Sequence, residues 1–230
     1  MRIPTPTHQL ARMPLFADLP TALLDELAQA GRVRQYPTGQ ILCIEGDPGD
    51  HLIVLEKGQL RISRVTPMGD EVVLSVVDAP AAVGELALLD GAPRDATVTA
   101  QRAVTVRLIP RSVFLSLLKR EPVAVEGLLR TLAGLVRAGN ARHADVLGLD
   151  VPGRLAKWLL NHAPTGQTGT IANGAVVILH CTQGELAAEL GTTRSTLNRA
   201  LHQFEGIRVL SVDGNQVTLH KPDTLRAYTS

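Results

Sequence analysis

The chain has 230 residues, which is long enough for two ordinary domains or one large one. Its formal net charge of +1 gives no overall attraction to nucleic acid or membranes, so any DNA binding must depend on where individual charges lie. Cys43 and Cys181 are far apart, which supports neither a disulfide scaffold, a zinc ribbon nor an iron–sulfur cluster. Residues 1–9 lack a secretion signal and no long apolar run follows, so we expect a cytoplasmic protein without a membrane partner.

The first half of the chain has the pattern of a helix followed by many short strands. Residues 21–28 carry leucine and alanine at helical spacing after the start signals Pro20 and Thr21. The segments expected to be strands are separated by Gly/Pro turns and cover residues 33–36, 41–45, 52–55, 60–65, 72–77 and 104–108. Strands at intervals of roughly 8–12 residues predict a small antiparallel barrel or jelly roll.

Residues 84–98 combine groups that suit a sugar phosphate. Gly84 and Glu85 open a short apolar turn, a Gly/Pro loop follows, and Arg94 precedes a strand-like stretch. The first N–H groups of a helix have no partners inside it and attract anions, and Arg94 adds a permanent positive charge. Glu85 would repel a phosphate but suits a hydrogen bond from a sugar hydroxyl. The motif therefore predicts a sugar-phosphate site.

This motif resembles the phosphate-binding cassette of cyclic-nucleotide-binding domains, as in catabolite activator proteins and kinase regulatory subunits. Every position matches that cassette except Asp95, where the family usually carries a small neutral residue. Residues 37–58, with their turn-forming glycines and aspartates, resemble the first half of the same β-roll. The resemblance implies cyclic AMP as the effector, bound by Gly84, Glu85, Leu86, Ala87, Arg94, Asp95, Ala96 and Asn140.

Two positions bear on how well cyclic AMP fits. A carboxylate at Asp95, about 4 Å from a phosphate, costs about 1–4 kcal/mol unless the side chain turns outward and offers only its backbone N–H. By the resemblance, Asn140 and Gly139 occupy the positions that present polar groups to the purine. Asn140 can pair with an adenine edge, whereas Gly139 has no side chain, which weakens base recognition.

Helical periodicity resumes over residues 111–118 and, after Pro122, extends to about residue 149. A helix of about 27 residues spans ~40 Å, more than one small domain needs. Residues near heptad spacing define a seam on this helix, with the members Leu128, Leu132, Leu135, Gly139, Val146 and Leu149. Leu129 and Val136 lie beside the seam, so the apolar side of the helix can also meet the β-roll. The seam predicts a parallel coiled-coil homodimer, as the resemblance implies, and the alternative is a helix packed on its own domain.

Residues 182–201 have the spacing of a helix-turn-helix. Thr182 suits the cap of the first helix, with Glu185 three residues later as its capping-box partner. Gly191 permits the turn, and Thr192 or Thr193 suits the cap of the second helix. A Gly-Asn turn then predicts a hairpin that forms a wing.

The span from residue 150 to residue 219 resembles the winged helix of catabolite activators, with a hinge at its start. The start of a recognition helix reaches base edges, so the DNA-contact candidates are Thr182, Thr193, Arg194, Ser195, Thr196, Asn198 and Arg199. Ser195 stands where the family often has glutamate, which puts cytosine recognition at that base pair in doubt. Charges from Thr182 to the end balance, so we expect moderate affinity with few phosphate contacts.

Both resemblances are to the cyclic-AMP receptor (CRP/FNR) family. They predict an α+β chain with a cyclic-nucleotide-binding β-roll over residues 1–124, a dimerisation helix over 125–149 and a winged helix-turn-helix domain over 150–230. The expected function is a homodimeric transcription regulator, not an enzyme. It would bind a palindromic site in double-stranded DNA, contact RNA polymerase and respond to cyclic AMP without a metal, through a two-state change carried by the long helix and hinge.

Other functions remain open on the sequence alone. The β-roll could bind another effector, or the regulator could act without one. A cupin-like metalloenzyme needs several converging histidine or carboxylate ligands, and the β-roll has only His51, in a turn region. A haem or redox sensor would use His51, Cys43 or His143, and oxidation of Cys181 is a further route to regulation.

Overall fold

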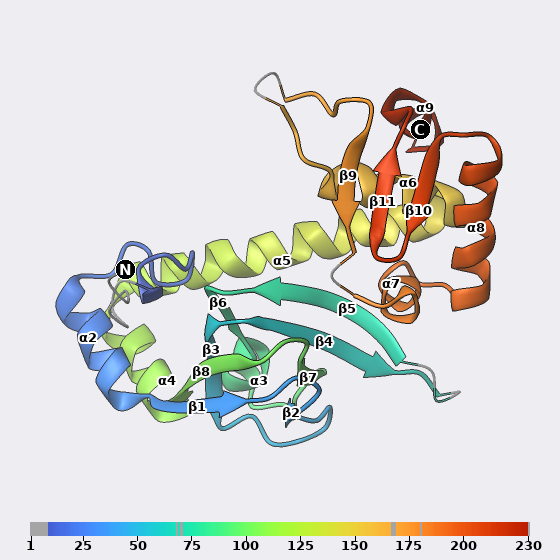
Figure 1. Ribbon diagram of the computed structural model, residues 1–230. Helices are drawn as coiled ribbons and strands as arrows, with labels where there is room; N and C mark the ends of the chain where they lie inside the picture. Colours follow the sequence, from blue (N-terminus) through green and yellow to red (C-terminus); the bar gives the residue numbers. More distant parts are fainter. Residues whose placement is uncertain (1–8, 68, 70, 167–168, 180, 230) are drawn as a thin grey trace. The chain divides into compact units, whose positions relative to one another are not determined.

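The computed structural model describes residues 9–67, 69, 71–166, 169–179 and 181–229. The chain divides into two compact units, Met1–Arg137 and Ala138–Ser230 (Figure 1). The first holds two β-sheets with helices around them, and the second holds helices and a three-stranded sheet. The long helix α5 (Pro122–Gly148) runs across the division. The predicted α+β class is confirmed.

The strands described in the first unit form two antiparallel four-stranded sheets, in the orders β1-β8-β3-β6 and β2-β7-β4-β5. Their bounds are β1 Arg32–Tyr36, β2 Ile41–Cys43, β3 His51–Lys57, β4 Gln59–Val65, β5 Glu71–Asp78, β6 Ala81–Val83, β7 Thr97–Ala100 and β8 Val104–Pro110. One core lies between the sheets, because it contains Ile53 and Leu55 of β3 together with Leu60 of β4. The predicted jelly roll is confirmed.

A second core lies on the other face of β3. Leu52 and Val54 alternate with the residues that face the first core, and they pack with α2 (Thr21–Ala30), α4 (Arg111–Arg120) and the first turns of α5. Helices α2 and α4 begin at the predicted positions. Burial on both faces explains why this strand is a continuous apolar run and does not alternate with polar residues.

A buried arginine joins two strands of the sheet to α2. Arg107 of β8 donates from Nε to Oε1 of Glu56 at 2.7 Å, and the two side chains are 7% and 10% exposed. Arg107 Nη1 also donates to the carbonyl of Ala28 near the end of α2 at 2.6 Å. Removing one partner of such a pair leaves a buried charge, which typically costs about 3–5 kcal/mol.

Two members of the predicted α5 seam, Leu135 and Val146, are exposed, but another member and the residues beside the seam do not lie where the prediction puts them. Leu128, predicted in the seam, is 5% exposed and packs in the core of its own unit. Leu129 and Val136, predicted beside the seam, are 60% and 62% exposed. The prediction was wrong at these positions, because the first turns of α5 bury Ala124 and Leu128 against their own unit and so turn the next residue outward.

The second unit packs its helices on a three-stranded sheet of order β10-β11-β9. Its elements are α6 Val151–His162, β9 Ala175–Ile178, α7 Gln183–Glu189, α8 Arg194–Gly206, β10 Leu210–Asp213, β11 Gln216–Leu219, α9 Pro222–Arg226 and a short 3₁₀ helix Ala227–Thr229. Leu159 of α6, Leu186 of α7 and Phe204 of α8 meet in its core. Strands β10 and β11 form a hairpin whose turn contains Gly214 at φ 58°, which confirms the predicted wing.

The segment predicted as a hinge begins α6. The Asp150 carboxylate accepts a hydrogen bond from the backbone N–H of Gly153 at 2.8 Å and so caps the helix. Arg154 donates from Nη1 to the carbonyl of Leu149 and from Nε to the carbonyl of Leu190, at 2.8 and 2.9 Å. These bonds fix the start of α6 against the end of α7.

Candidate functional site

Gly84 forms the backbone turn at the start of the cassette. It has φ 86° and precedes α3 (Glu85–Asp90), which ends at Gly91. A left-handed φ favours glycine, and a Cβ on Gly84 would lie 2.3 Å from Nη1 of Arg94. The glycine therefore supplies both the turn and the space that the arginine needs.

Arg94 places a positive charge inside the first unit. It is 3% exposed and donates to the carbonyls of Gly84 and His51 at 2.9 and 2.6 Å. Its buried Nε has no hydrogen-bond partner among the residues that the structure describes. A buried cation held by carbonyl groups, with no carboxylate bonded to it, suits an anionic ligand.

Glu85 is the second buried charge of the cassette. It is 6% exposed, and burial raises the pKa of its carboxyl group, although its own backbone N–H, the Arg94 charge and the Gly84 backbone oppose this shift. As a carboxylate it is an acceptor for a sugar hydroxyl. Arg94 and Glu85 thus provide one donor and one acceptor, which fits a sugar phosphate.

The first half of the β-roll packs directly on the cassette. The backbone N–H of Arg94 donates to the carbonyl of Asp47 at 2.7 Å, and that of Gly46 donates to the carbonyl of Arg94 at 2.9 Å. A Cβ on Gly49 would lie 2.4 Å from Cβ of Ala87, which is itself 3% exposed. The two segments that resemble cyclic-nucleotide-binding domains therefore form one site region.

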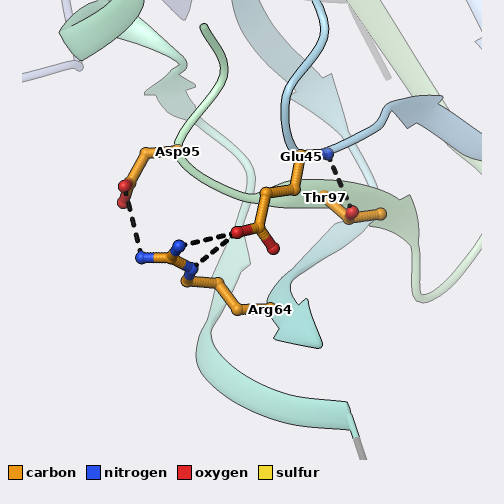
Figure 2. Close-up of polar contacts among 4 residues, drawn as sticks. All are labelled: Glu45, Arg64, Asp95 and Thr97. Carbon is orange, nitrogen blue, oxygen red and sulfur yellow. Dashed lines mark hydrogen bonds and ion pairs between the residues drawn. The ribbon is translucent and has the colours of Figure 1, made fainter. Parts of the chain in front are cut away.

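The remaining cassette candidates differ in exposure. Leu86 is 44% exposed and Ala96 is partly buried. The Asp95 side chain is 59% exposed and pairs with Arg64 at 3.5 Å, so it turns outward (Figure 2). Asn140 is an exposed residue of α5 in the second unit, whereas the cassette belongs to the first, and its purine contact stays a prediction.

The helix-turn-helix has the predicted caps. Thr182 and Glu185 form a reciprocal capping box at the start of α7, with backbone-to-side-chain distances of 2.7 and 3.2 Å. Thr193 Oγ1 accepts from the backbone N–H of Thr196 at 3.3 Å and caps α8. Leu197 and Leu201 are buried in the core, so the opposite side of α8 faces solvent.

The start of α8 presents polar side chains to solvent. Arg194, Ser195 and Arg199 are exposed, while Thr196 and Asn198 are partly buried. The Ser195 hydroxyl lies 3.0 Å from Oγ1 of Thr193, and Arg199 Nη2 donates to Oγ1 of Thr196 at 3.1 Å. Among the described residues, Arg194 and Arg199 keep N–H donors without a partner, whereas the serine hydroxyl has one.

Both the unit with the cassette and the unit with the helix-turn-helix match known protein families. Residues 33–121 match the cyclic nucleotide-binding domain family, and residues 153–228 match the Crp-like helix-turn-helix domain family. The CRP-like cAMP-activated global transcriptional regulator of Mycobacterium tuberculosis is 32% identical over 217 residues, which cover 94% of this chain and 96% of the relative. The chain belongs to the CRP/FNR family of transcriptional regulators.

Two less similar proteins of known name also match this chain, one by sequence and one by structure. The cAMP-activated global transcriptional regulator CRP of Salmonella typhimurium is 26% identical over 189 residues, covering 82% of this chain and 89% of the relative. The structure of CLP, a c-di-GMP-responsive global regulator of Xanthomonas campestris, matches with a TM-score of 0.76 at 19% identity, over 87% of this chain and 99% of that one. The second match supports the fold.

Membership of the CRP/FNR family makes the chain a DNA-binding transcription regulator with a cyclic-nucleotide-binding domain, and the metalloenzyme alternative is wrong. Within the described residues, no group of three or more His, Cys, Asp or Glu side chains suits a metal ion, and no helix is long and apolar enough to cross a membrane. Burial and the charges of Glu189 and Glu185 raise the pKa of Cys181 to about 11, so the thiol is a weak nucleophile at neutral pH.

Sequence reasoning missed several side chains that shape these regions. Arg64 pairs with Asp95 from β4, and nothing in the alternating pattern of that strand distinguished it from a solvated arginine. Trp158 Nε1 donates to Glu189 at 2.9 Å and so helps hold α6 to α7. Glu205 of α8 accepts from the backbone N–H of Val212 at 3.1 Å, which ties the recognition helix to the wing.

Proposed function

We propose that this regulator is a homodimer whose affinity for a palindromic DNA site depends on cyclic AMP. The effector would contact Gly84, Glu85, Leu86, Ala87, Arg94, Ala96, the backbone of Asp95 and, at the purine, Asn140. Its binding favours one of two conformations, and α5 carries the change to the winged helix. The sensor domain is residues 1–124, the dimerisation helix 125–149 and the DNA-binding domain 150–230. The active dimer contacts RNA polymerase in the cytoplasm.

The observation that carries this proposal is the buried pair of opposite charges in the cassette. Arg94 is 3% exposed and has no carboxylate bonded to it in the described structure, and Glu85 is 6% exposed. A cyclic phosphodiester carries one negative charge and has no proton to donate, so it suits the arginine. The adjacent ribose hydroxyl is a donor, so it suits the glutamate.

Cyclic AMP is the first effector to test because of the closer relatives. The M. tuberculosis and S. typhimurium proteins are both named as cAMP-activated regulators. The Xanthomonas protein with the same fold is named as responsive to c-di-GMP, although its 19% identity supports the fold alone. A comparison of these two nucleotides therefore tests effector identity directly.

The exposed side of α5 supports a dimer. Leu129 and Val136 are seven residues apart and 60% and 62% exposed, and Leu135 and Val146 are 48% and 54% exposed. Apolar residues at this spacing on a long helix match a coiled-coil interface with a second copy. A two-fold dimer would present two recognition helices, which accounts for a palindromic site.

In each subunit the start of α8 would read the DNA. Arg194 and Arg199 are exposed and have donors that suit guanine O6 and N7. Asn198 and Thr196 lie on the same turn, while Thr193 and Thr182, which cap their helices, would approach phosphates. Ser195 is expected to contribute least to base recognition, because its short hydroxyl already shares a hydrogen bond with Thr193.

Calorimetry on the full chain tests the effector, with cyclic AMP, cyclic GMP, c-di-GMP and 5′-AMP as titrants. We expect heat of binding from cyclic AMP at micromolar concentrations and little from linear 5′-AMP. Fluorescence anisotropy with a labelled palindromic duplex should then show at least about tenfold tighter DNA binding with cyclic AMP, a coupling of about 1.4 kcal/mol. Absence of both responses at millimolar cyclic AMP would contradict the proposal.

A second candidate keeps DNA binding but removes cyclic AMP control. The exposed carboxylate of Asp95 beside the cassette favours it, as does Gly139, which offers no side chain to a base. In that case cyclic AMP leaves DNA affinity unchanged, and either another titrant produces the heat or the protein binds its site without any effector. The same two assays therefore separate the candidates.

A further inference from the structure

Two adjacent charged residues of the cassette differ sharply in exposure. Arg94 is 3% exposed and bonds to backbone carbonyls inside the unit. Asp95 comes next in the chain, yet its side chain is 59% exposed. A carboxylate one residue from an anion-binding arginine opposes anion binding unless something keeps it away or neutralises it.

Arg64 of β4 holds the Asp95 side chain. Its Nη1 lies 3.5 Å from Oδ1 of Asp95, and Figure 2 shows the carboxylate directed at the guanidinium group. The same guanidinium donates from Nη2 and Nε to Oε1 of Glu45 at 2.6 and 3.0 Å. Arg64 therefore bridges two carboxylates on the surface of the β-roll.

The backbone of Glu45 anchors the two ion pairs that Arg64 makes with Glu45 and Asp95. The N–H of Glu45 donates to Oγ1 of Thr97 on β7 at 3.0 Å (Figure 2). Glu45, which binds Arg64, is therefore itself bonded to a strand. Two bonds to Glu45 restrict the guanidinium orientation, and that orientation leaves Nη1 for Asp95. The guanidinium that faces Asp95 is thus oriented by its own bonds to Glu45.

We propose that Arg64 is a positioning residue of the cyclic-nucleotide site, which keeps the Asp95 carboxylate neutralised and directed away from the phosphate bound by Arg94. This inference rests on the proposed function. At ~4 Å, a free carboxylate would weaken phosphate binding by about fivefold in a water-like medium and by several hundredfold at an effective dielectric of about 20. Because Asp95 is exposed, we expect an effect of about tenfold.

A double-mutant cycle tests the proposal by calorimetry with cyclic AMP on the full chain. Arg64→Met should weaken binding about tenfold, whereas Asp95→Ser should change it by less than about threefold. The double variant should bind like Asp95→Ser, because the charge that Arg64 controls is gone. Arg64→Lys keeps the positive charge and should retain most of the affinity. Arg120→Met is the matched control, since it breaks an ion pair with Glu26 at an arginine of similar exposure, 48% against 49%.

Three results would overturn the inference. The first is an equal loss in Arg64→Met and in the double variant, which would mean that Arg64 acts independently of Asp95. The second is a gain of tenfold or more in Asp95→Ser, which would mean that Asp95 opposes the nucleotide even with Arg64 present. The third is unchanged binding in Arg64→Met.

Failure of the proposed function would give a different set of binding results. If wild type and every variant bind no cyclic nucleotide, that function fails and the inference fails with it. If wild type binds cyclic AMP and Arg64→Met binds it equally well, the function stands and the inference alone fails. If Asp95→Ser binds cyclic AMP and wild type does not, the inference fails while the cassette remains a nucleotide site.

Discussion

The cassette and the recognition helix use charged residues in opposite ways. In the cassette, Arg94 and Glu85 are 3% and 6% exposed, and the arginine is held by backbone carbonyls. In the recognition helix, Arg194 and Arg199 are exposed, and Arg199 donates to the hydroxyl of Thr196 three residues before it. Buried charges are already desolvated and oriented, whereas exposed charges keep water and rotamer freedom until DNA arrives.

The difference matches the two kinds of ligand. A small effector offers few contacts, so its site must hold each group in place beforehand. DNA offers many phosphates and base edges, so flexible exposed arginines suffice, with affinity that depends on salt. The two regions should therefore respond differently to mutation, pH and salt.

The largest expected effect is at Arg94. Arg94→Gln should weaken cyclic AMP binding about a hundredfold, because it removes a buried charged donor worth up to about 3 kcal/mol. Binding of DNA without nucleotide should not change, since α8 belongs to the other unit. Calorimetry and anisotropy measure the two effects, and thermal melting checks that the variant folds. Arg94→Lys, which keeps the charge, should retain part of the affinity; unaltered binding by Arg94→Gln would rule the cassette out as the anion site.

Arg199→Gln tests the other side of the comparison. It should weaken specific DNA binding by about 1–3 kcal/mol and relax selectivity at one base pair, while cyclic AMP affinity stays the same. Arg226→Gln is the matched control, because Arg226 is an arginine of the same unit already paired with Asp223. Equal losses in the two variants would mean that Arg199 contributes only general charge.

Titration of Glu85 should have a smaller effect than the substitutions of Arg94 and Arg199. Its pKa lies above the ordinary value of 4.5, mainly because of burial. Between 4.5 and that raised pKa the folded state holds more protons than the unfolded state, so Glu85 makes stability fall as pH rises through this window. Binding has the opposite sign, because the carboxylate is the better acceptor. Cyclic AMP affinity should fall about tenfold as pH drops through the raised pKa. Glu85→Gln should flatten both profiles, and slopes unchanged by the substitution would assign them to another group.

Ser195 should give the smallest effect. Its hydroxyl already bonds to Thr193, so Ser195→Ala should change DNA affinity by less than about threefold. Ser195→Glu should instead add a preference for cytosine at one base pair, worth about 1–3 kcal/mol. Selection of bound sequences from a random pool measures both. A large loss in Ser195→Ala would show that the serine reads DNA.

Much of the fold could be predicted because its local patterns are strong. The apolar run at Leu52–Leu55, the capping box at Thr182 and the glycine of the wing turn each indicate one local structure, and the structure confirms them. The seam of α5 could not be placed, because apolar residues occur on both sides of the helix. One residue turns the face by about 100°, and only the packing of Leu128 decides which side is buried.

The cassette motif was visible in sequence, but its supporting contacts were not. Arg64 and Asp95 are 31 residues apart, and Glu56 and Arg107 are 51 apart. Such pairs form because the jelly roll brings distant strands together, and no local spacing encodes that register. The outward turn of Asp95 accompanies one of these contacts, so the sequence alone leaves it as one of two alternatives.

Reciprocal coupling between effector and DNA tests the central claim most directly. Calorimetry would measure cyclic AMP affinity with and without saturating palindromic duplex, and anisotropy would measure duplex affinity with and without saturating cyclic AMP. We predict that both affinities increase by the same factor, at least about tenfold, because linkage requires equal factors. A duplex affinity that does not change when cyclic AMP saturates the protein would contradict effector control.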